Sequence, residues 1–292
     1  LENSIRYSNP ESNELSMIFS FHHLKVDYPS GNKWEIEPFR FHDLKKHLFT
    51  WQEEMEKGGG WNALFWCNHD QPRIVSRIGN EKEYRVKSAK CLATAIHGLK
   101  GTPYIYQGEE IGMTNAGYTS IDEYMDIESL NYYNILKLQG KSEEEVIRIL
   151  GAKSRDNSRT PMQWDASENA GFTKGTPWLK VCDRYKEINT ESRHEPDSVF
   201  QYYKELVKLR KELPVIQKGA VTPLLREDKE ILAYKREYQG KELYVFCNFF
   251  DGEVKVPYSI PEDCKSILSN YGEEISPREL VLRPYEAVMF LR

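Results

Sequence analysis

The sequence predicts an α/β fold built on a parallel sheet, followed by an antiparallel all-β region. Three short apolar runs, near residues 17–21, 63–67 and 102–106, lead into polar residues and are separated by segments of helical periodicity. This alternation of strand and helix is typical of parallel sheets. After residue 218 the pattern changes to short strand-like runs divided by turn residues. On pattern alone, a β/α barrel and an open sheet remain alternatives.

The parallel part is predicted to cover residues 1–218. A helix is expected from about Asp43 to the glycines at 58–60, and a second helix over 86–96, where apolar residues recur at helical spacing. A helical insertion is expected near 122–150, since Ser142 with Glu145 forms a capping-box pattern and Gly151 suits a C-terminal cap. A long loop follows over 154–164, and then a helix over 198–211.

The all-β part is predicted to cover residues 219–292 as a β-sandwich domain. Its expected strands are 231–237, 242–249, 254–258, 265–270 and 286–291.

Composition excludes several classes of function. The formal net charge is −5 and no basic block occurs, which argues against a nucleic-acid partner. No window approaches eighteen consecutive apolar residues, so no membrane span is expected. The five cysteines are scattered without a C-x-x-C pair, which suggests reduced thiols in a cytoplasmic protein and neither a metal nor a redox motif.

The strongest candidate site is Asn68-His69-Asp70, directly after an apolar run. In parallel α/β folds, the C-terminal edge of the sheet carries the chemistry. Asp70 and His69 could hold two adjacent hydroxyls of a sugar, or the triplet could be a polar cap on the strand. Glu109 and Glu110, after the third run, could supply a second carboxylate for acid–base work, or could belong to a solvated loop.

Two further groups of cationic side chains are candidates. Arg155 and Arg159 lie in the long loop, where they could contact a substrate or only hold the loop together. His22, His23 and Lys25 follow the first strand and could form an anion site, although paired histidines are more often structural.

Several long motifs resemble glycoside hydrolase family 13, the α-amylase superfamily, in its oligo-1,6-glucosidase-like branch. They are FWCNHDQPRIVSRIGN at 65–80, GTPYIYQGEEIGMTN at 101–115, SRDNSRTPMQWD at 154–165 and FSFHHLKVDYPSGNKW at 19–34. The resemblance implies the C-terminal portion of a (β/α)8 TIM barrel, with strands six to eight in the three apolar runs. It also implies retaining hydrolysis of an α-glucosidic bond by two carboxylates about 5–5.5 Å apart.

The resemblance also suggests roles for individual residues. Asp70 matches the family's third carboxylate, which stabilises the transition state without attacking the sugar. His69 matches a histidine bound to the same glucose, and Arg159 and Arg155 match loop arginines near it. The nucleophilic Asp and the acid/base Glu of the family have no counterpart here. The chain is therefore expected to be the C-terminal half of an enzyme, inactive and unstable without the missing N-terminal half.

Within that branch, the resemblance of residues 19–34 and 61–77 implies a sugar phosphate as the substrate, α,α-trehalose 6-phosphate, hydrolysed to glucose and glucose 6-phosphate. Lys25, with His22 or His23 and Lys33, would bind the phosphate. No cofactor is expected in this segment, because the calcium-binding loop of many relatives would lie in the missing half. The alternatives are an oligo-1,6-glucosidase or α-glucosidase acting on unphosphorylated α-glucosides, and a non-catalytic glycosidase-like module.

Overall fold

The computed structural model describes residues 1–292. Its helices are α1 (Glu2–Ser8), α2 (Phe41–Lys57), α3 (Ile74–Arg77), α4 (Arg85–His97), α5 (Ile127–Leu138), α6 (Glu143–Lys153), α7 (Asp156–Arg159), α8 (Val199–Glu212) and α9 (Pro214–Lys218). Its strands are β1 (Ile18–Phe19), β2 (Asn62–Leu64), β3 (Thr102–Pro103), β4 (Ala220–Leu224), β5 (Ile231–Tyr238), β6 (Lys241–Asn248), β7 (Val254–Lys255), β8 (Lys265–Ser269), β9 (Val281–Leu282) and β10 (Ala287–Leu291).

The three apolar runs form a parallel sheet in the order β1-β2-β3. Ile18 pairs with Asn62, and Ala63 pairs with Thr102. The strands are shorter than predicted. β3 covers only Thr102 and Pro103, and the Tyr104 N–H that follows donates to the Leu64 carbonyl at 2.7 Å. β1 and β3 are the edges of this sheet, so the structure has a mixed α/β part with three parallel strands and no closed barrel.

The two helices that pack on this sheet follow the predicted periodicity. α2 buries an apolar stripe that includes Leu44, Leu48 and Met55, and it ends before Gly58 as expected. α4 lies within one residue of its predicted ends, and almost every residue from Ser88 to its C-terminus is buried. It is enclosed on several sides because it packs against β6 and β10 as well as against α8.

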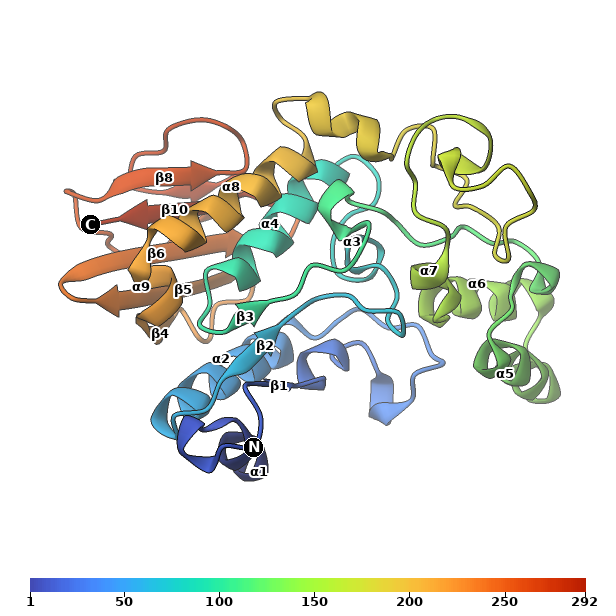
Figure 1. Cartoon of the computed structure of the whole chain (residues 1–292), viewed down its shortest axis with the longest axis horizontal. Coiled ribbons are helices and arrows are strands. Elements are labelled where there is room, and N and C mark those ends of the chain that lie inside the picture. The colour runs from blue at the N-terminus through green and yellow to red at the C-terminus, as the bar shows by residue number, and fades with distance from the viewer.

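The helical insertion consists of α5 and α6, which lie with α7 on the side of the molecule opposite the antiparallel sheet (Figure 1). The predicted capping box is present: Ser142 Oγ accepts from the Glu145 N–H at 3.2 Å, and Glu145 Oε2 accepts from the Ser142 N–H at 3.1 Å. Gly151 does not end α6, which continues to Lys153. The final turn is held by the Lys153 side chain, which reaches a buried carboxylate described below.

The C-terminal region forms an antiparallel sheet in the order β4-β5-β6-β10-β8, with the separate pair β7-β9 beside it. Five predicted strands occur, although β7 is much shorter than the expected 254–258. β4 and β9 were not predicted. β4 contains Pro223 and lies at the edge of the sheet, where a residue without an N–H is tolerated.

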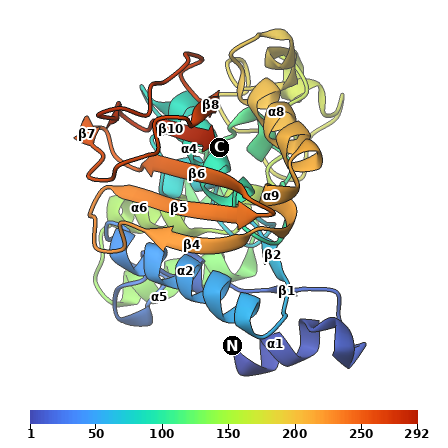
Figure 2. The same cartoon turned by 90° about the vertical axis from the view of Figure 1, so that its left-hand side faces the viewer.

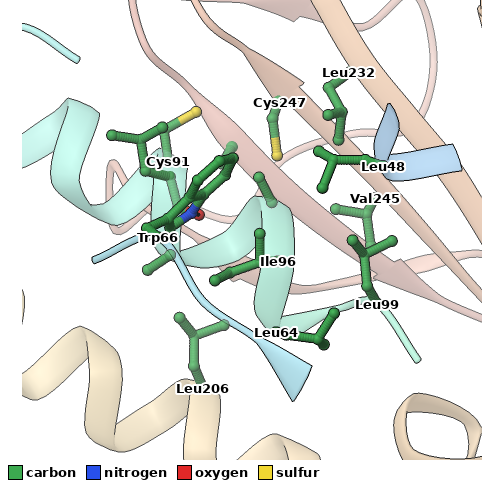
Figure 3. Packing of buried hydrophobic residues seen from close by; sticks show 14 of the residues in the cluster. Leu48, Leu64, Trp66, Cys91, Ile96, Leu99, Leu206, Leu232, Val245 and Cys247 are labelled. Atoms are coloured by element: carbon green, nitrogen blue, oxygen red, sulfur yellow. Dashed lines mark hydrogen bonds between the residues drawn. The ribbon is translucent and has the colours of Figure 1, made fainter. Parts of the chain in front are cut away.

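One hydrophobic core joins the two parts of the chain. α2 and α4 lie on the antiparallel sheet, as Figure 2 shows for α2 beside β4. In this core, Leu64 and Trp66 from the parallel part pack with Ile96 of α4 and with Val245 and Cys247 of β6 (Figure 3). The site-bearing segment after β2 therefore rests on a core to which the C-terminal sheet contributes.

Candidate functional site

The segment after β2 has buried apolar residues, which anchor it, followed by polar residues that face the surface. Phe65, Trp66 and Cys67 are buried, and the Trp66 Nε1–H donates to the Leu92 carbonyl at 2.7 Å. The next side chains turn outward: those of His69 and Asp70 are 71 % and 41 % exposed. A buried strand thus fixes the position of two exposed polar groups.

A local turn sets the direction of the Asp70 carboxylate. Asn68 Oδ1 accepts from the Asp70 N–H at 2.7 Å, which is the pattern of an Asx turn. His69 Nε2 lies 3.4 Å from Asp70 Oδ2. The imidazole and the carboxylate are therefore adjacent, as required for a pair of groups that bind neighbouring hydroxyls.

Arg159, at the end of α7, contacts this turn through two of its nitrogen atoms and Asp126 through the third. Its Nε–H donates to the His69 carbonyl at 2.8 Å, and its Nη2 pairs with Asp70 Oδ1 at 2.5 Å. Its Nη1 lies 3.5 Å from Oδ1 of Asp126, the residue before α5. The structure thus brings together residues predicted from two separate motifs, His69 and Asp70 from one and Arg159 from the other.

Arg155 and Lys33 join the same group through two acidic residues. Arg155 binds Asp126 with both ends of its guanidinium, Nε to Oδ2 at 3.0 Å and Nη2 to Oδ1 at 2.6 Å. Arg155 Nε is also 3.2 Å from Glu128 Oε2, which pairs with Lys33 Nζ at 2.7 Å. Asp126 and Glu128 were not predicted, because next to a helix start they look like ordinary N-terminal acidic residues.

The surroundings shift the proton affinities of these groups. Burial raises the pKa of the Asp126 carboxyl, but the hydrogen bonds and charge of Arg155, with the charge of Arg159, outweigh it and hold the pKa below its usual range. Burial lowers the pKa of Lys33, against the opposing effect of Glu128. Asp126 therefore stays ionised and keeps two cations in place.

An apolar cleft of about 340 Å³ lies beside His69. It is lined by Phe19, Phe21, Phe65, Cys67, Asn68, His69, Tyr104, Ile105 and Tyr106. The rings of Phe19 and Tyr104 meet edge to face at 4.8 Å, yet these side chains remain almost half exposed. Aromatic walls beside a polar corner suit a sugar, which has both apolar faces and hydroxyl edges.

The two histidines after β1 lie away from the charged group. His23 is buried, and its Nε2 is 2.8 Å from the Phe65 carbonyl. Burial lowers its pKa to about 4, so it is neutral at physiological pH. The His22 ring packs at a tilt against His47 and Trp51 of α2, with ring centroids 5.8 and 5.4 Å away. Lys25 is exposed and forms no ion pair.

Glu109 faces the core and not the cleft. Its side chain is 4 % exposed, and its Oε1 accepts from the Tyr203 hydroxyl at 2.8 Å. Its Oε2 is buried without a partner. Burial raises the pKa of Glu109 to about 7, against the opposing effect of the Tyr203 hydrogen bond. Nothing in this placement gives Glu109 access to a substrate in the cleft.

This buried carboxyl should make stability depend on pH. The pKa of Glu109 is about 7 in the folded state against 4.5 in the unfolded chain. Between these values the unfolded chain loses a proton that the folded state keeps, so stability falls as pH rises. Glu109→Gln removes this titrating group. In the complete protein, the free energy of unfolding of the variant minus that of the parent should therefore be more positive at pH 8 than at pH 5, by up to about 3 kcal/mol. Urea unfolding at both pH values measures this, with Glu144→Gln, at an exposed position of α6, as control. Equal differences at the two pH values would contradict the assignment.

A second set of unpredicted residues ties the site's segments together below its surface. Asp27 accepts from Arg77 and from Lys153, at 2.5 Å from Arg77 Nη2 and 2.8 Å from Lys153 Nζ, and all three side chains are almost fully buried. Asp27 lies in the segment of Lys25 and Lys33, Arg77 lies in α3 after Asp70, and Lys153 precedes Arg155. Their separation in sequence left no local signal by which to find them.

No three His, Cys, Asp or Glu side chains are arranged to hold a metal ion, and all five cysteines are free and buried. Among the helices, none combines the length and the apolar character needed to cross a bilayer.

Comparison with known proteins gives the family of this α/β chain. Residues 1–219 match the catalytic domain of alpha amylase. The chain therefore belongs to the alpha-amylase family. Within it, the chain falls in the branch of trehalose-6-phosphate hydrolases and oligo-1,6-glucosidases.

Two relatives and one solved structure illustrate the similarity. The chain is 50 % identical to trehalose-6-phosphate hydrolase of Bacillus subtilis over 99 % of its length, and 48 % identical to oligo-1,6-glucosidase of Halalkalibacterium halodurans over 100 %. It covers 53 % of each. It superimposes on the crystal structure of Bacillus licheniformis trehalose-6-phosphate hydrolase with a TM-score of 0.96 at 54 % identity, over 99 % of this chain and 54 % of that one. The chain thus spans about half the length of the curated relatives it matches.

Proposed function

We propose that this chain is part of a retaining α-glucosidase that hydrolyses α,α-trehalose 6-phosphate to glucose and glucose 6-phosphate. The observation that carries the proposal is the fixed corner of His69, Asp70 and Arg159 beside an aromatic cleft. In this proposal Asp70 and His69 grip the hydroxyls of the glucose ring, and Asp70 favours the distorted, positively charged sugar of the transition state.

In this proposal, the groups that break the glycosidic bond are not residues of this chain segment. A nucleophilic carboxylate and an acid/base would come from further strands of the same barrel, pairing with the open edges of β1 and β3. The open edges of β1 and β3 support this arrangement, because the edge strands of a sheet are ordinarily paired or covered. A cytoplasmic location fits a phosphorylated substrate and remains part of the proposal.

Lys25 is the side chain that we assign to the phosphate. It is exposed and has no acidic partner, whereas Lys33 is already paired with Glu128 and His23 is buried and neutral. Lysine binds phosphate as a compact positive charge. Lys33 would add to this site only if the phosphate displaces Glu128, and His22 would need to leave its contacts with α2.

Removal of Lys25 should weaken only the phosphorylated substrate. A charge-assisted contact contributes about 1.5–3 kcal/mol. In the full-length enzyme, Lys25→Ala should therefore lower kcat/KM for trehalose 6-phosphate about ten- to a hundredfold. Hydrolysis of an unphosphorylated aryl α-glucoside should hardly change. Lys46→Ala, at an exposed position of α2, is the matched control. Equal losses on both substrates would show that Lys25 does not bind the phosphate.

An oligo-1,6-glucosidase is the second candidate. Its first support is the nearly equal identity to the Halalkalibacterium halodurans enzyme. Its second is the pairing of Lys33 with Glu128, because a lysine that is already neutralised fits a site that binds no phosphate. Parallel kcat/KM measurements on trehalose 6-phosphate and isomaltose separate the two candidates.

A further inference from the structure

The candidate site contains a continuous series of alternating charges. Each neighbouring pair lies within 3.5 Å, and the series runs from the loop before α2 to the turn after β2. Its members are, in order, Lys33, Glu128, Arg155, Asp126, Arg159 and Asp70.

Asp126 is the most buried member of this series. Its side chain is 2 % exposed, against 24 % for Arg159 and 41 % for Asp70. Its backbone is fixed as well, because Asp156 Oδ2 accepts from the N–H groups of Met125 and Asp126, each at 2.9 Å. Because the Asp126 carboxylate is held rigidly, it can fix the positions of the more exposed side chains that bind to it.

The two arginines need a negative charge between them. Arg155 and Arg159 are four residues apart at α7, where like charges on one face of a helical turn repel each other. Asp126 neutralises this repulsion, since its Oδ1 lies 2.6 Å from Arg155 and 3.5 Å from Arg159. Without that charge, the Arg159 guanidinium would keep only its contacts with His69 and Asp70. Because this turn is exposed, it would not fix the position of Arg159 by itself.

We propose that Asp126 is a positioning residue, which holds Arg159 and through it the Asp70 carboxylate against the glucose ring. The inference rests on the proposed glucosidase function but not on the phosphate. Asp126 does not touch the substrate; it orients a group that does. Asp70 must align with charge that develops only in the transition state, so its displacement lowers kcat more than it raises KM.

The test uses the full-length enzyme and an unphosphorylated aryl α-glucoside. Asp126→Asn keeps the shape of the side chain and removes its charge. We expect kcat to fall about ten- to a hundredfold, as for a catalytic group displaced by roughly an ångström, with a smaller change in KM. Asp122→Asn, an exposed position four residues earlier without an ion pair, should leave kcat unchanged. If kcat of Asp126→Asn equals that of Asp122→Asn, the inference is wrong.

A double-mutant cycle separates positioning from general structural support. Arg159→Gln already removes the group that Asp126 holds, so adding Asp126→Asn to it should cost little further kcat. Fully additive losses would overturn the inference. If Asp126→Asn does not fold, Asp126→Glu decides, because it keeps the buried charge but displaces it. A lowered kcat at an unchanged melting temperature supports the inference, and the parental kcat refutes it. A parent enzyme with no activity on the aryl glucoside would instead overturn the proposed function, and the inference with it.

Discussion

Asp70→Asn in the full-length enzyme is expected to lower kcat about 100- to 1000-fold on phosphorylated and unphosphorylated α-glucosides alike. The substitution keeps the shape of the side chain but removes the negative charge that favours the developing positive charge on the sugar. The loss of one preorganised electrostatic group of this kind ordinarily costs that much. The measurement is steady-state kinetics on trehalose 6-phosphate and on an aryl α-glucoside.

The same substitution should hardly affect stability. The Asp70 side chain is 41 % exposed, and exposed ion pairs contribute only about 0–1 kcal/mol. Asp183→Asn is the control, since Asp183 forms a comparable surface pair with Lys180 at 3.0 Å outside the site. A normal kcat in Asp70→Asn, or a loss confined to the phosphorylated substrate, would remove Asp70 from the role proposed here.

The sequence predicted those elements whose signals are local. The capping box at Ser142 and the periodic apolar faces of α2 and α4 each depend on neighbouring residues, and the structure confirms them. The end of α6 was predicted too early because the helix continues past Gly151 to Lys153, whose side chain is fixed by the distant Asp27 carboxylate. A contact of this kind has no trace in the local pattern.

In the candidate site, too, residues with a local sequence signal were predicted, and residues defined by distant contacts were not. His69 and Asp70 were predicted as site residues because they directly follow an apolar run, and Arg159 because it lies in a distinctive motif; the structure shows that the three are in contact. The structure places His23 in the core. The position of a histidine after a strand does not reveal whether its side chain is buried or exposed to a ligand. Asp126 was not predicted because the residues it contacts, Arg155 and Arg159, lie about thirty residues later in the sequence. Charge networks are properties of the packed fold, and each member by itself resembles an ordinary surface residue.

Asp27 is the residue whose replacement should cost the most stability. Its carboxylate lies between two buried cations, Arg77 and Lys153, and Tyr28 covers both, with its ring centroid 5.3 Å from each. Asp27→Asn would leave these cations without a counter-charge in a region that water does not reach. Breaking a buried ion pair on one side costs about 3–5 kcal/mol. Urea unfolding of the full-length protein at neutral pH measures the loss.

Acid should reproduce part of this effect in the parent protein. Burial raises the pKa of Asp27, but Arg77 and Lys153 outweigh it and hold the pKa below 3.8, its value in the unfolded chain. The stability from this carboxylate is therefore fully present above pH 3.8 and is lost as pH falls through the lower folded pKa. The difference in stability between parent and Asp27→Asn should shrink accordingly in strong acid. Asp43→Asn, which breaks the exposed pair with Arg40, should cost no more than about 1 kcal/mol. If Asp27→Asn is as mild as this control, the buried triad does not hold the three segments of the site together.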